Sequence, residues 1–327
     1  MRILNRRYDV TGIGSALLDF VVLVDDSFLD EMKLEKGTMH LIDEDRSREI
    51  FQRLINYKKE IIPGGSSANT VAGVSALKGK GAFIGRVAND ENGKSYIKQT
   101  VDSGVESYIL QGSGITGHAI TYITPDMERT FTTHLGAALN LSTDDFDIEV
   151  VENSSVLHLE GYLFEAENLK EVCFKAMDAA KRFGTLISID LADPGLIERA
   201  SSVLNRVVDD YADIVFVNED EAFKFTGFKE QEALEALAER TAFAAVKLGD
   251  RGSLIKTGGK SFVIPSYSVD VVNTNGAGDM YAAGIIYGLT RGFSPELAGK
   301  IGSYAASLVV ASTGARYTEP IDISHII

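Results

Sequence analysis

The sequence predicts an α/β fold with three layers, in which helices cover both faces of a mostly parallel central sheet. Strand-like and helix-like segments alternate along most of the 327 residues, and such alternation implies right-handed crossovers between parallel strands. Neither an internal repeat nor a linker rich in Pro, Gly or Ser divides the chain. Because 45% of the residues are hydrophobic, the chain can bury one large core. We therefore expect a single domain over residues 1–327.

The first part of the chain contains the first expected strands and helices. Residues 8–14 and 20–24 are apolar runs typical of strands, whereas residues 25–45 are polar and irregular. Apolar side chains recur at helical spacing over residues 44–60, which predicts a helix there. The next expected elements are a helix over residues 67–78, a strand over 82–87 and a helix over 91–104.

Residues 107–135 interrupt this alternation. They contain three short β-branched or aromatic runs and a turn at residues 125–128, which predicts a small antiparallel insertion. The alternation then resumes, and a hairpin centred on Gly258 and Gly259 is expected over residues 253–265. The other expected elements are strands over residues 155–159, 185–191, 214–218 and 242–248, and a helix over 166–182. In such folds the active site lies beyond the carboxyl ends of the strands.

Charge and cysteine content limit the partners. The formal net charge of −15 would repel nucleic acid and anionic lipid, so neither is an expected partner. The single cysteine, Cys173, cannot form an intrachain disulfide, and the first residues lack the apolar core of a signal peptide. We expect a cytoplasmic protein without a membrane span.

Several familiar motifs fail on closer reading. Glycines at 112, 114 and 117 match the dinucleotide pattern but precede a strand-like segment, where pyrophosphate binding needs a helix. Gly93-Lys94-Ser95 lacks the earlier glycine of a P-loop, and the five histidines show no metal-ligand spacing. These sites are therefore rejected.

The most informative segment covers residues 271–289. An apolar run, expected as a strand, leads into Gly276, Ala277, Gly278 and Asp279, and an apolar helix follows. Amides at such a helix start can hold a phosphate or a developing negative charge. Asp279, in the first turn, can accept a proton from a substrate hydroxyl. The alternative is purely structural: the glycines form a tight turn, and Asp279 is an ordinary acid in the first turn of the helix.

Two further clusters also stand before helices. Gly64 and Gly65 permit unusual backbone conformations, and Asn69 offers a donor and an acceptor to a polyol. Asn218 and Glu221 follow a predicted strand and suit Mg²⁺ bound through water. The alternatives are a loop with a serine N-cap for the first cluster and ordinary helix capping for the second.

In this order, the three clusters resemble the signatures of the ribokinase-like, or PfkB-type, carbohydrate kinase family over essentially the whole chain. Within the family the chain is most similar to adenosine kinases and related nucleoside kinases. The resemblance implies a ribokinase-like α/β/α fold with a β-sheet lid, here expected from about residues 17–43 and 107–135. It also implies ATP and Mg²⁺ as cofactors.

The resemblance also implies a role for each matching residue. Asp279 is the expected base, and Gly276, Ala277 and Gly278 are the expected anion hole. Asn218 and Glu221 would hold the Mg²⁺–water network. The remaining implied residues are Asp19, Gly64, Gly65 and Asn69 for the acceptor, Arg129 over the phosphates, and Lys247, Gly249, Gly252, Asn275 and Gly314 for the nucleotide.

One position departs from the family pattern. The family usually has Asp where this chain has Asn273, six residues before the expected base. In relatives stimulated by a monovalent cation that Asp helps to form the ion site, so we do not expect activation by potassium.

The acceptor is the open question. Residues 12–42 and 129–138 look more like adenosine kinases than like ribokinase, and Tyr162, Leu163 and Phe164 could stack on a purine. Core packing explains these three side chains equally well. The expected function is phosphoryl transfer to the primary hydroxyl of an adenosine-like nucleoside. The alternatives are a ribose, fructose or ketohexonate kinase and a catalytically silent nucleoside or sugar sensor; the protein is expected to be a monomer or homodimer.

Overall fold

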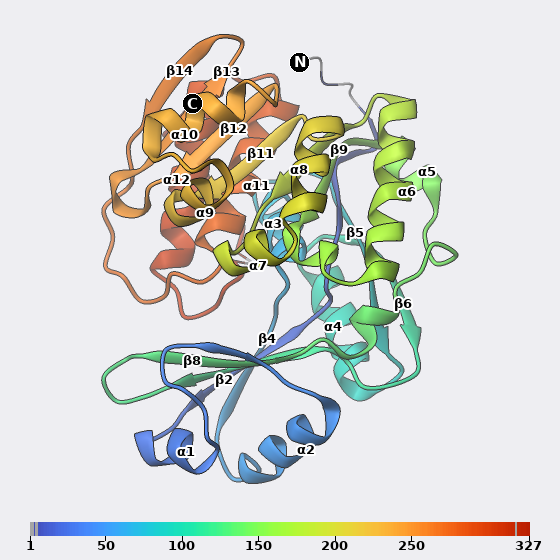
Figure 1. The fold of residues 1–327 in the computed structure, drawn as a ribbon, viewed down its shortest axis with the longest axis vertical. Helices are drawn as coiled ribbons and strands as arrows, with labels where there is room; N and C mark the ends of the chain where they lie inside the picture. Colours follow the sequence, from blue (N-terminus) through green and yellow to red (C-terminus); the bar gives the residue numbers. More distant parts are fainter. Residues whose placement is uncertain (1–2, 4–5, 318) are drawn as a thin grey trace.

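The structure is a computed structural model and describes residues 3, 6–317 and 319–327. Over these residues the strands form two sheets, a large one of nine strands and a small one of five (Figure 1). The predicted α/β class with a mostly parallel large sheet is confirmed. None of the helices within the described ranges is long and apolar enough to cross a membrane.

The large sheet has the strand order β14-β13-β12-β11-β10-β9-β1-β5-β6. From β12 to β6 all neighbours are parallel, and β13 and β14 form the antiparallel hairpin predicted from the two glycines. The strands are β1 (Tyr8–Ile13), β5 (Gly81–Ala88), β6 (Glu106–Gly112), β9 (Ser154–Glu160), β10 (Leu186–Asp190), β11 (Ile214–Asn218), β12 (Phe243–Lys247), β13 (Ser253–Thr257) and β14 (Lys260–Ile264).

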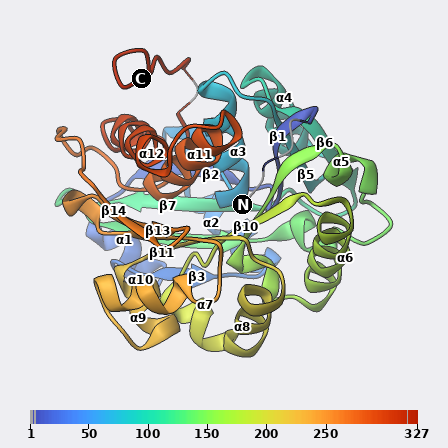
Figure 2. The same ribbon diagram turned by 90° about the horizontal axis from the view of Figure 1, so that it is seen from above.

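Helices cover both faces of this sheet (Figure 2). One face carries α3 (Ser66–Ala76), α4 (Glu91–Asp102), α11 (Ala277–Thr290) and α12 (Pro295–Val310). The other face carries α5 (Ile148–Glu152), α6 (Glu167–Phe183), α7 (Pro194–Arg199), α8 (Ser201–Asp210), α9 (Glu219–Thr226) and α10 (Glu230–Ala238). Successive side chains of a strand point to opposite faces, so Val215 and Phe216 of β11 enter different hydrophobic cores.

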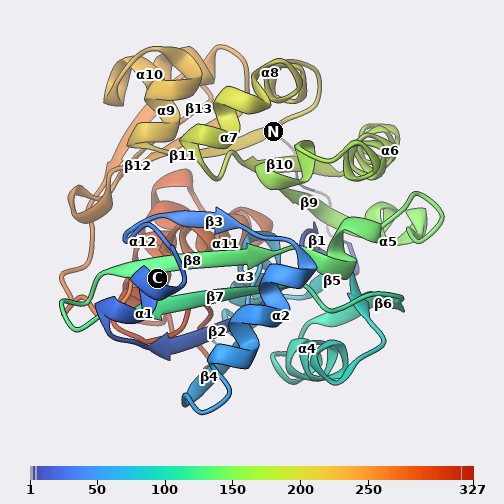
Figure 3. The ribbon, with the colours of Figure 1, turned by 60° about the horizontal axis from the view of Figure 1, so that its bottom comes forward.

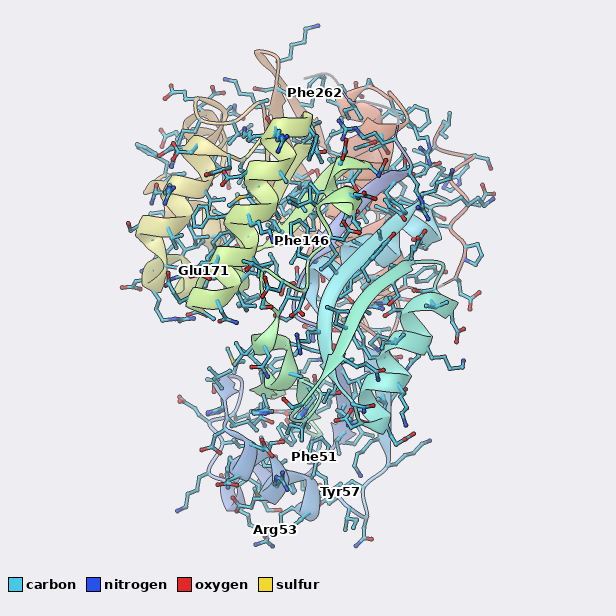
Figure 4. The ribbon with its side chains drawn as sticks, turned by 90° about the vertical axis from the view of Figure 1, so that its right-hand side faces the viewer. Phe51, Arg53, Tyr57, Phe146, Glu171 and Phe262 are labelled. Atoms are coloured by element: carbon cyan, nitrogen blue, oxygen red, sulfur yellow. The ribbon has the colours of Figure 1, made fainter. Side chains whose placement is uncertain are left out.

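The small sheet lies beside the carboxyl ends of the large sheet (Figures 1 and 3). Its order is β3-β8-β7-β2-β4. Its strands are β2 (Leu18–Leu23), β3 (Met39–Leu41), β4 (Lys59–Pro63), β7 (His118–Ile123) and β8 (Arg129–His134), and α1 (Asp26–Glu31) and α2 (Glu44–Arg53) cover the face turned away from the large sheet. Phe51 of α2 packs against Phe20 with ring centroids 5.0 Å apart, and Figure 4 shows Phe51 between the helix and the strands.

The bounds predicted for the small sheet need correction. The helix expected over residues 44–60 ends at Arg53, because residues 59–63 pair with β2 as an edge strand of the small sheet. The first run of the expected insertion, β6, instead extends the large sheet parallel to β5. The remaining insertion is not purely antiparallel, since β7 pairs in parallel with β2. These pairings join distant segments, which local periodicity cannot reveal.

Candidate active site

The site is built around the start of α11. Gly276 adopts a φ of +77°, and a Cβ there would overlap the carbonyl oxygen of Ala315; the position therefore requires glycine. The strand expected before it is absent: residues 265–275 are irregular. The amides of Val272 and Asn273 donate to the carbonyl of Val310 at 2.9 and 3.0 Å. The segment is thus held by the end of α12 rather than by a sheet.

The first turn of α11 presents unused amides. Among the described residues, the N–H groups of Gly276, Gly278 and Asp279 donate to no protein acceptor, whereas Ala277 donates to the carbonyl of Thr274 at 3.3 Å. These amides point out of the helix N-terminus, where the helix dipole is positive. The predicted anion hole therefore has the donors that an anion needs.

The Asp279 carboxylate is held by two donors from α3. Ser66 Oγ donates to Oδ1 at 2.6 Å, and Asn69 Nδ2 donates to Oδ2 at 2.9 Å. Burial raises the pKa of Asp279 to about 6, although both hydrogen bonds oppose the rise. A carboxylate with this pKa is ionised at neutral pH and is a better proton acceptor than an exposed one.

Asp19, on strand β2 of the small sheet, faces Asp279 across the site. A Cβ at Gly64 would stand 2.5 Å from Asp19 Oδ2, so glycine is needed for this close approach. Burial raises the pKa of Asp19 to about 7, Arg316 opposes this rise, and Asp279 adds to it. The structure thus brings together Asp19, Gly64, Asn69 and Asp279, while Gly65, at a φ of +91°, caps α3.

Glu160 joins the two sides beneath this site. Its carboxylate, at the end of β9, accepts the amides of Ser15 at 2.9 Å and Ser67 at 2.8 Å. Burial raises its pKa to about 7, and these two bonds oppose the rise. Glu160 therefore fixes the loop after β1 against the start of α3.

A second set of charges lies at the ends of β10, β11 and β12. Lys247 Nζ pairs with Asp190 Oδ2 at 2.6 Å, with side chains 15% and 4% exposed. Burial disfavours the ammonium, but Asp190 and Glu221 outweigh this effect and raise the pKa of Lys247. A Cβ on Gly278 would lie 3.0 Å from this Nζ. A cation therefore stands at the anion hole.

Asn218 and Glu221 form a capping box at the start of α9. Glu221 accepts the Asn218 amide at 2.7 Å and its Nδ2 at 2.6 Å, while Asn218 Oδ1 accepts the Glu221 amide at 2.9 Å. The capping alternative to the metal role is therefore present in the structure. Capping does not account for the burial of Glu221, which is 2% exposed beside Lys247 and has a raised pKa from that burial.

A hollow of about 480 Å³ adjoins the anion hole. It is bounded by the turn after β12, the irregular segment, α11 and α12, and its lining includes Lys247, Gly249, Gly252, Tyr267 and Tyr281. The structure thus brings most of the residues predicted for the nucleotide to one hollow. Gly314 instead lines a different hollow of about 540 Å³ near Ile62.

Arg129, at the start of β8, reaches from the small sheet to the irregular segment. Its guanidinium donates to Asn273 Oδ1 and, at 3.2 Å, to the carbonyl of Val272. Asn273 Oδ1 also accepts the amide of Asn275 at 2.9 Å. The oxygen at the position where the family usually has Asp is therefore already engaged.

The three side chains predicted to stack on a purine differ in their exposure. Leu163 and Phe164 are buried in the core with α6, as the packing alternative predicts. Tyr162 is 38% exposed and lies near the carboxylates of Asp193 and Glu160. Only Tyr162 stays available to a ligand.

Sequence reasoning missed Ser66, Glu160, Asp190 and Arg316. Glu160 and Asp190 end strands that were predicted, and a buried acid at the carboxyl end of a strand was a usable signal. Ser66 was regarded as part of a cap. Arg316 follows the last helix and had no local signal.

Comparison with known proteins bears on the family of the chain. Residues 53–322 match the family model described as pfkB family carbohydrate kinase. The crystal structure of adenosine kinase from Sinorhizobium meliloti is 34% identical, with a TM-score of 0.88 over 96% of this chain and 97% of that chain. A probable sugar kinase from Rhizobium etli CFN 42 is 32% identical, with a TM-score of 0.89 over 97% of each chain.

Relatives known by sequence widen the range of acceptors. The 5-dehydro-2-deoxygluconokinase of Geobacillus kaustophilus is 29% identical over 264 residues, which are 76% of this chain and 79% of the relative. Nucleoside and sugar kinase names thus occur at similar levels of identity. Similarity alone does not choose the acceptor.

Proposed function

The chain belongs to the pfkB family of carbohydrate kinases, and we propose that it transfers the γ-phosphoryl group of ATP to the primary hydroxyl of an adenosine-like nucleoside. The family membership confirms the predicted resemblance, the ribokinase-like fold and the activity as a phosphotransferase with an alcohol acceptor. The nucleoside, the residue roles and the metal are proposals. The observation that carries the choice of a nucleoside is the apolar face of the small sheet beside Asp19.

The reaction needs alignment and charge stabilisation. The acceptor oxygen attacks the γ-phosphorus, its proton passes to Asp279 Oδ, and ADP leaves. The hydrogen bonds from Ser66 and Asn69 orient this carboxylate toward the cleft. The amides of Gly276 and Gly278 and the ammonium of Lys247 stabilise the negative charge on the transferring group.

Asn218 and Glu221 are the proposed contacts of Mg²⁺. Across the described ranges, no group of three or more His, Cys, Asp or Glu side chains is arranged to hold a metal ion. The Glu221 oxygens already accept two bonds, which fits an ion carried by the nucleotide and contacted through water. Such an ion would neutralise phosphate charge, and the two residues would orient its waters.

The face of the small sheet turned toward the large sheet supports a nucleoside acceptor (Figure 1). Asp19 is paired with Ala119, and the next row on this face consists of Glu60, Val21, Thr121, Phe131 and Met39, with Glu60 on the edge strand β4 and Phe131 on the opposite side of β2. With strands about 4.8 Å apart and residues of one face about 6.8 Å apart along a strand, Phe131 stands roughly 12 Å from Asp19. An acceptor whose hydroxyls meet Asp19 thus meets apolar surface beyond them.

This surface matters because a free sugar has no apolar face of comparable size, whereas a purine does. Tyr162, from η2 (Gly161–Phe164), adds an exposed ring on the side of the large sheet. The sugar kinases among the relatives keep a fructose, ribose or ketohexonate acceptor as the second candidate. The proposal of a lid that closes over either acceptor rests on Arg129, which links the small sheet to Asn273.

The test is an activity assay with Mg·ATP and a panel of nucleosides and sugars, in which ADP release is followed. We expect turnover with purine nucleosides. Turnover with a sugar alone would favour the second candidate. Tight binding of one compound without turnover on any would favour a sensor. Potassium is added in parallel, and we expect no stimulation because Asn273 Oδ1 is engaged by Arg129 and Asn275.

A further inference from the structure

Arg316 is a buried cation that the proposed roles leave unexplained. It follows α12, at the far end of the chain from Asp19, and is 5% exposed. A buried guanidinium is costly unless its charge and its donors are used. The contacts of Arg316 should therefore show what its buried charge does.

The guanidinium of Arg316 bridges two parts of the acceptor side. Nε donates to Asn69 Oδ1 at 3.1 Å, and Nη2 donates to the carbonyl of Gly64 at 3.2 Å. The hydroxyl of Tyr96 donates to the same carbonyl at 2.9 Å. Gly64 lies where β4 of the small sheet leads into α3. Arg316 thus contacts both the junction of the small sheet with α3 and Asn69, a neighbour of the base.

Asn69 stands between a cation and an anion. Its Oδ1 accepts from Arg316, and its Nδ2 donates to Asp279 Oδ2 at 2.9 Å. The two ends of an amide are not interchangeable, because one only accepts and the other only donates. As long as Arg316 occupies the oxygen, the NH₂ group must face Asp279. Asn69 is 4% exposed, so water has little access to replace either contact.

The geometry points to Arg316 as a positioning residue that fixes the amide orientation of Asn69 and, through it, the carboxylate of Asp279. The inference rests on the proposed function in that it takes Asp279 as the base. Loss of Arg316 leaves the buried Asn69 Oδ1 without this donor, so the amide can shift and its hydrogen bond to the Asp279 carboxylate loosens. Because Arg316 also holds Gly64, the base is tied to the point where the small sheet joins α3.

Lysine cannot fully replace this arginine. Guanidinium presents donors in a rigid planar fork, whereas an ammonium is a single point donor on a flexible stem. One ammonium therefore satisfies Asn69 or Gly64 well, but not both. Arg316→Lys should keep part of the function that Arg316→Met loses.

The test compares Arg316→Lys, Arg316→Met and Asn69→Ala, alone and combined. We expect kcat to fall about 10- to 100-fold in Arg316→Met, because small misplacement of a reacting group is costly. KM for ATP should stay within about twofold of the native value. The kcat of Arg316→Lys should lie between those of the native protein and Arg316→Met. In Arg316→Met/Asn69→Ala the loss of kcat should be well below the product of the two single losses, since both variants act on the amide of Asn69.

Arg291→Met is the matched control. Arg291 makes two bonds to Asp9, at 2.7 and 2.8 Å, away from the catalytic groups. Its loss should leave kcat unchanged. The inference is overturned if Arg316→Lys and Arg316→Met keep the native kcat, or if their losses multiply with that of Asn69→Ala.

A readout without substrate separates this inference from the proposed function. The side-chain amide NMR signals of Asn69, assigned by their disappearance in Asn69→Ala, should shift in the folded Arg316→Lys protein. Unchanged signals would refute the contact whatever the acceptor proves to be. Absence of turnover by the native protein would instead refute the proposed function and leave the NMR result to decide on Arg316.

Discussion

The nucleotide side and the acceptor side of the site are assembled in different ways. On the nucleotide side, Asp190, Asn218 and Lys247 follow one another at the ends of three adjacent parallel strands. On the acceptor side, Asp19 comes from the small sheet, Asn69 from α3 and Arg316 from the last segment of the chain. The first is one edge of a sheet. The second joins both sheets, so its geometry depends on how the two sheets are placed relative to each other.

Charge follows the same division. The nucleotide side offers free amides to an anion, together with Lys247, which also faces the carboxylates of Asp190 and Glu221. The acceptor side places two carboxyls, Asp19 and Asp279, near each other with Arg316 as a nearby cation. Phosphate charge is therefore favoured on one side, and hydroxyl groups that donate hydrogen bonds are favoured on the other. Substitutions on each side test whether the two sides act separately.

Asp279→Asn should have the largest effect. Removing the proton acceptor should lower kcat on the order of 10²-fold or more, with KM for ATP little changed. Asp19→Asn should instead raise KM for the acceptor more than it lowers kcat. Steady-state kinetics with both substrates varied measures the two variants. Nearly native kcat in Asp279→Asn would remove the base from the account.

Lys247→Met should impair catalysis through the nucleotide side of the site. Loss of the cation at the anion hole should lower kcat roughly 10²-fold, as removal of one oxyanion donor does elsewhere. Its effect should not depend on the acceptor used. Lys256→Met is the matched control, because Lys256 pairs with Glu235 outside the site; it should keep native kcat. An acceptor-dependent effect of Lys247→Met would show that the two sides are not separate.

Phe131→Ala should weaken binding of the acceptor without affecting binding of ATP. Loss of a stacking surface should raise KM for a purine nucleoside about 10-fold, while KM for ATP stays constant. Ile55→Ala is the control, because Ile55 is exposed beyond α2. KM values from initial rates check both variants. An unchanged KM in Phe131→Ala would remove the apolar face from the argument for a nucleoside.

The pH profile should show the mildest effect. Burial raises the pKa of Asp279 to about 6, and only the ionised carboxylate accepts a proton. The rate is therefore full above this pKa, halves near pH 6 and falls further as the pH is lowered. The pH dependence of kcat measures it. A rate constant that is level from pH 7 down to pH 5 would contradict the assigned base.

The division between the sides also governs what could be predicted from sequence. Short motifs contain the glycines before α3 and α11, Asp279, and the pair Asn218 and Glu221. The structure places these motifs near the strand ends. Ser66 and Asp279 are 213 residues apart, and Arg316 and Asn69 are 247 apart. No local pattern connects such pairs, so the acceptor side was predicted without its positioning residues.

Two element errors have the same origin. The helix predicted over residues 44–60 ends at Arg53, and its last two residues belong instead to a strand over 59–63 that pairs with β2. Val271 and Val272 were expected in an apolar strand, but their side chains are exposed, and the backbone of Val272 bonds to the end of α12 instead of to a sheet. In both cases a distant partner decides the backbone, while the strands of the large sheet follow their own residue pattern.

The most direct test of the central claim is the ratio of kcat/KM for adenosine to kcat/KM for fructose, ribose and a ketohexonate, measured on the same protein with saturating Mg·ATP. We predict a ratio above about 10² in favour of adenosine, with adenosine 5′-phosphate as the product, because only a nucleoside uses both Asp19 and the apolar face beyond it. A ratio below one for any of these sugars would contradict the account.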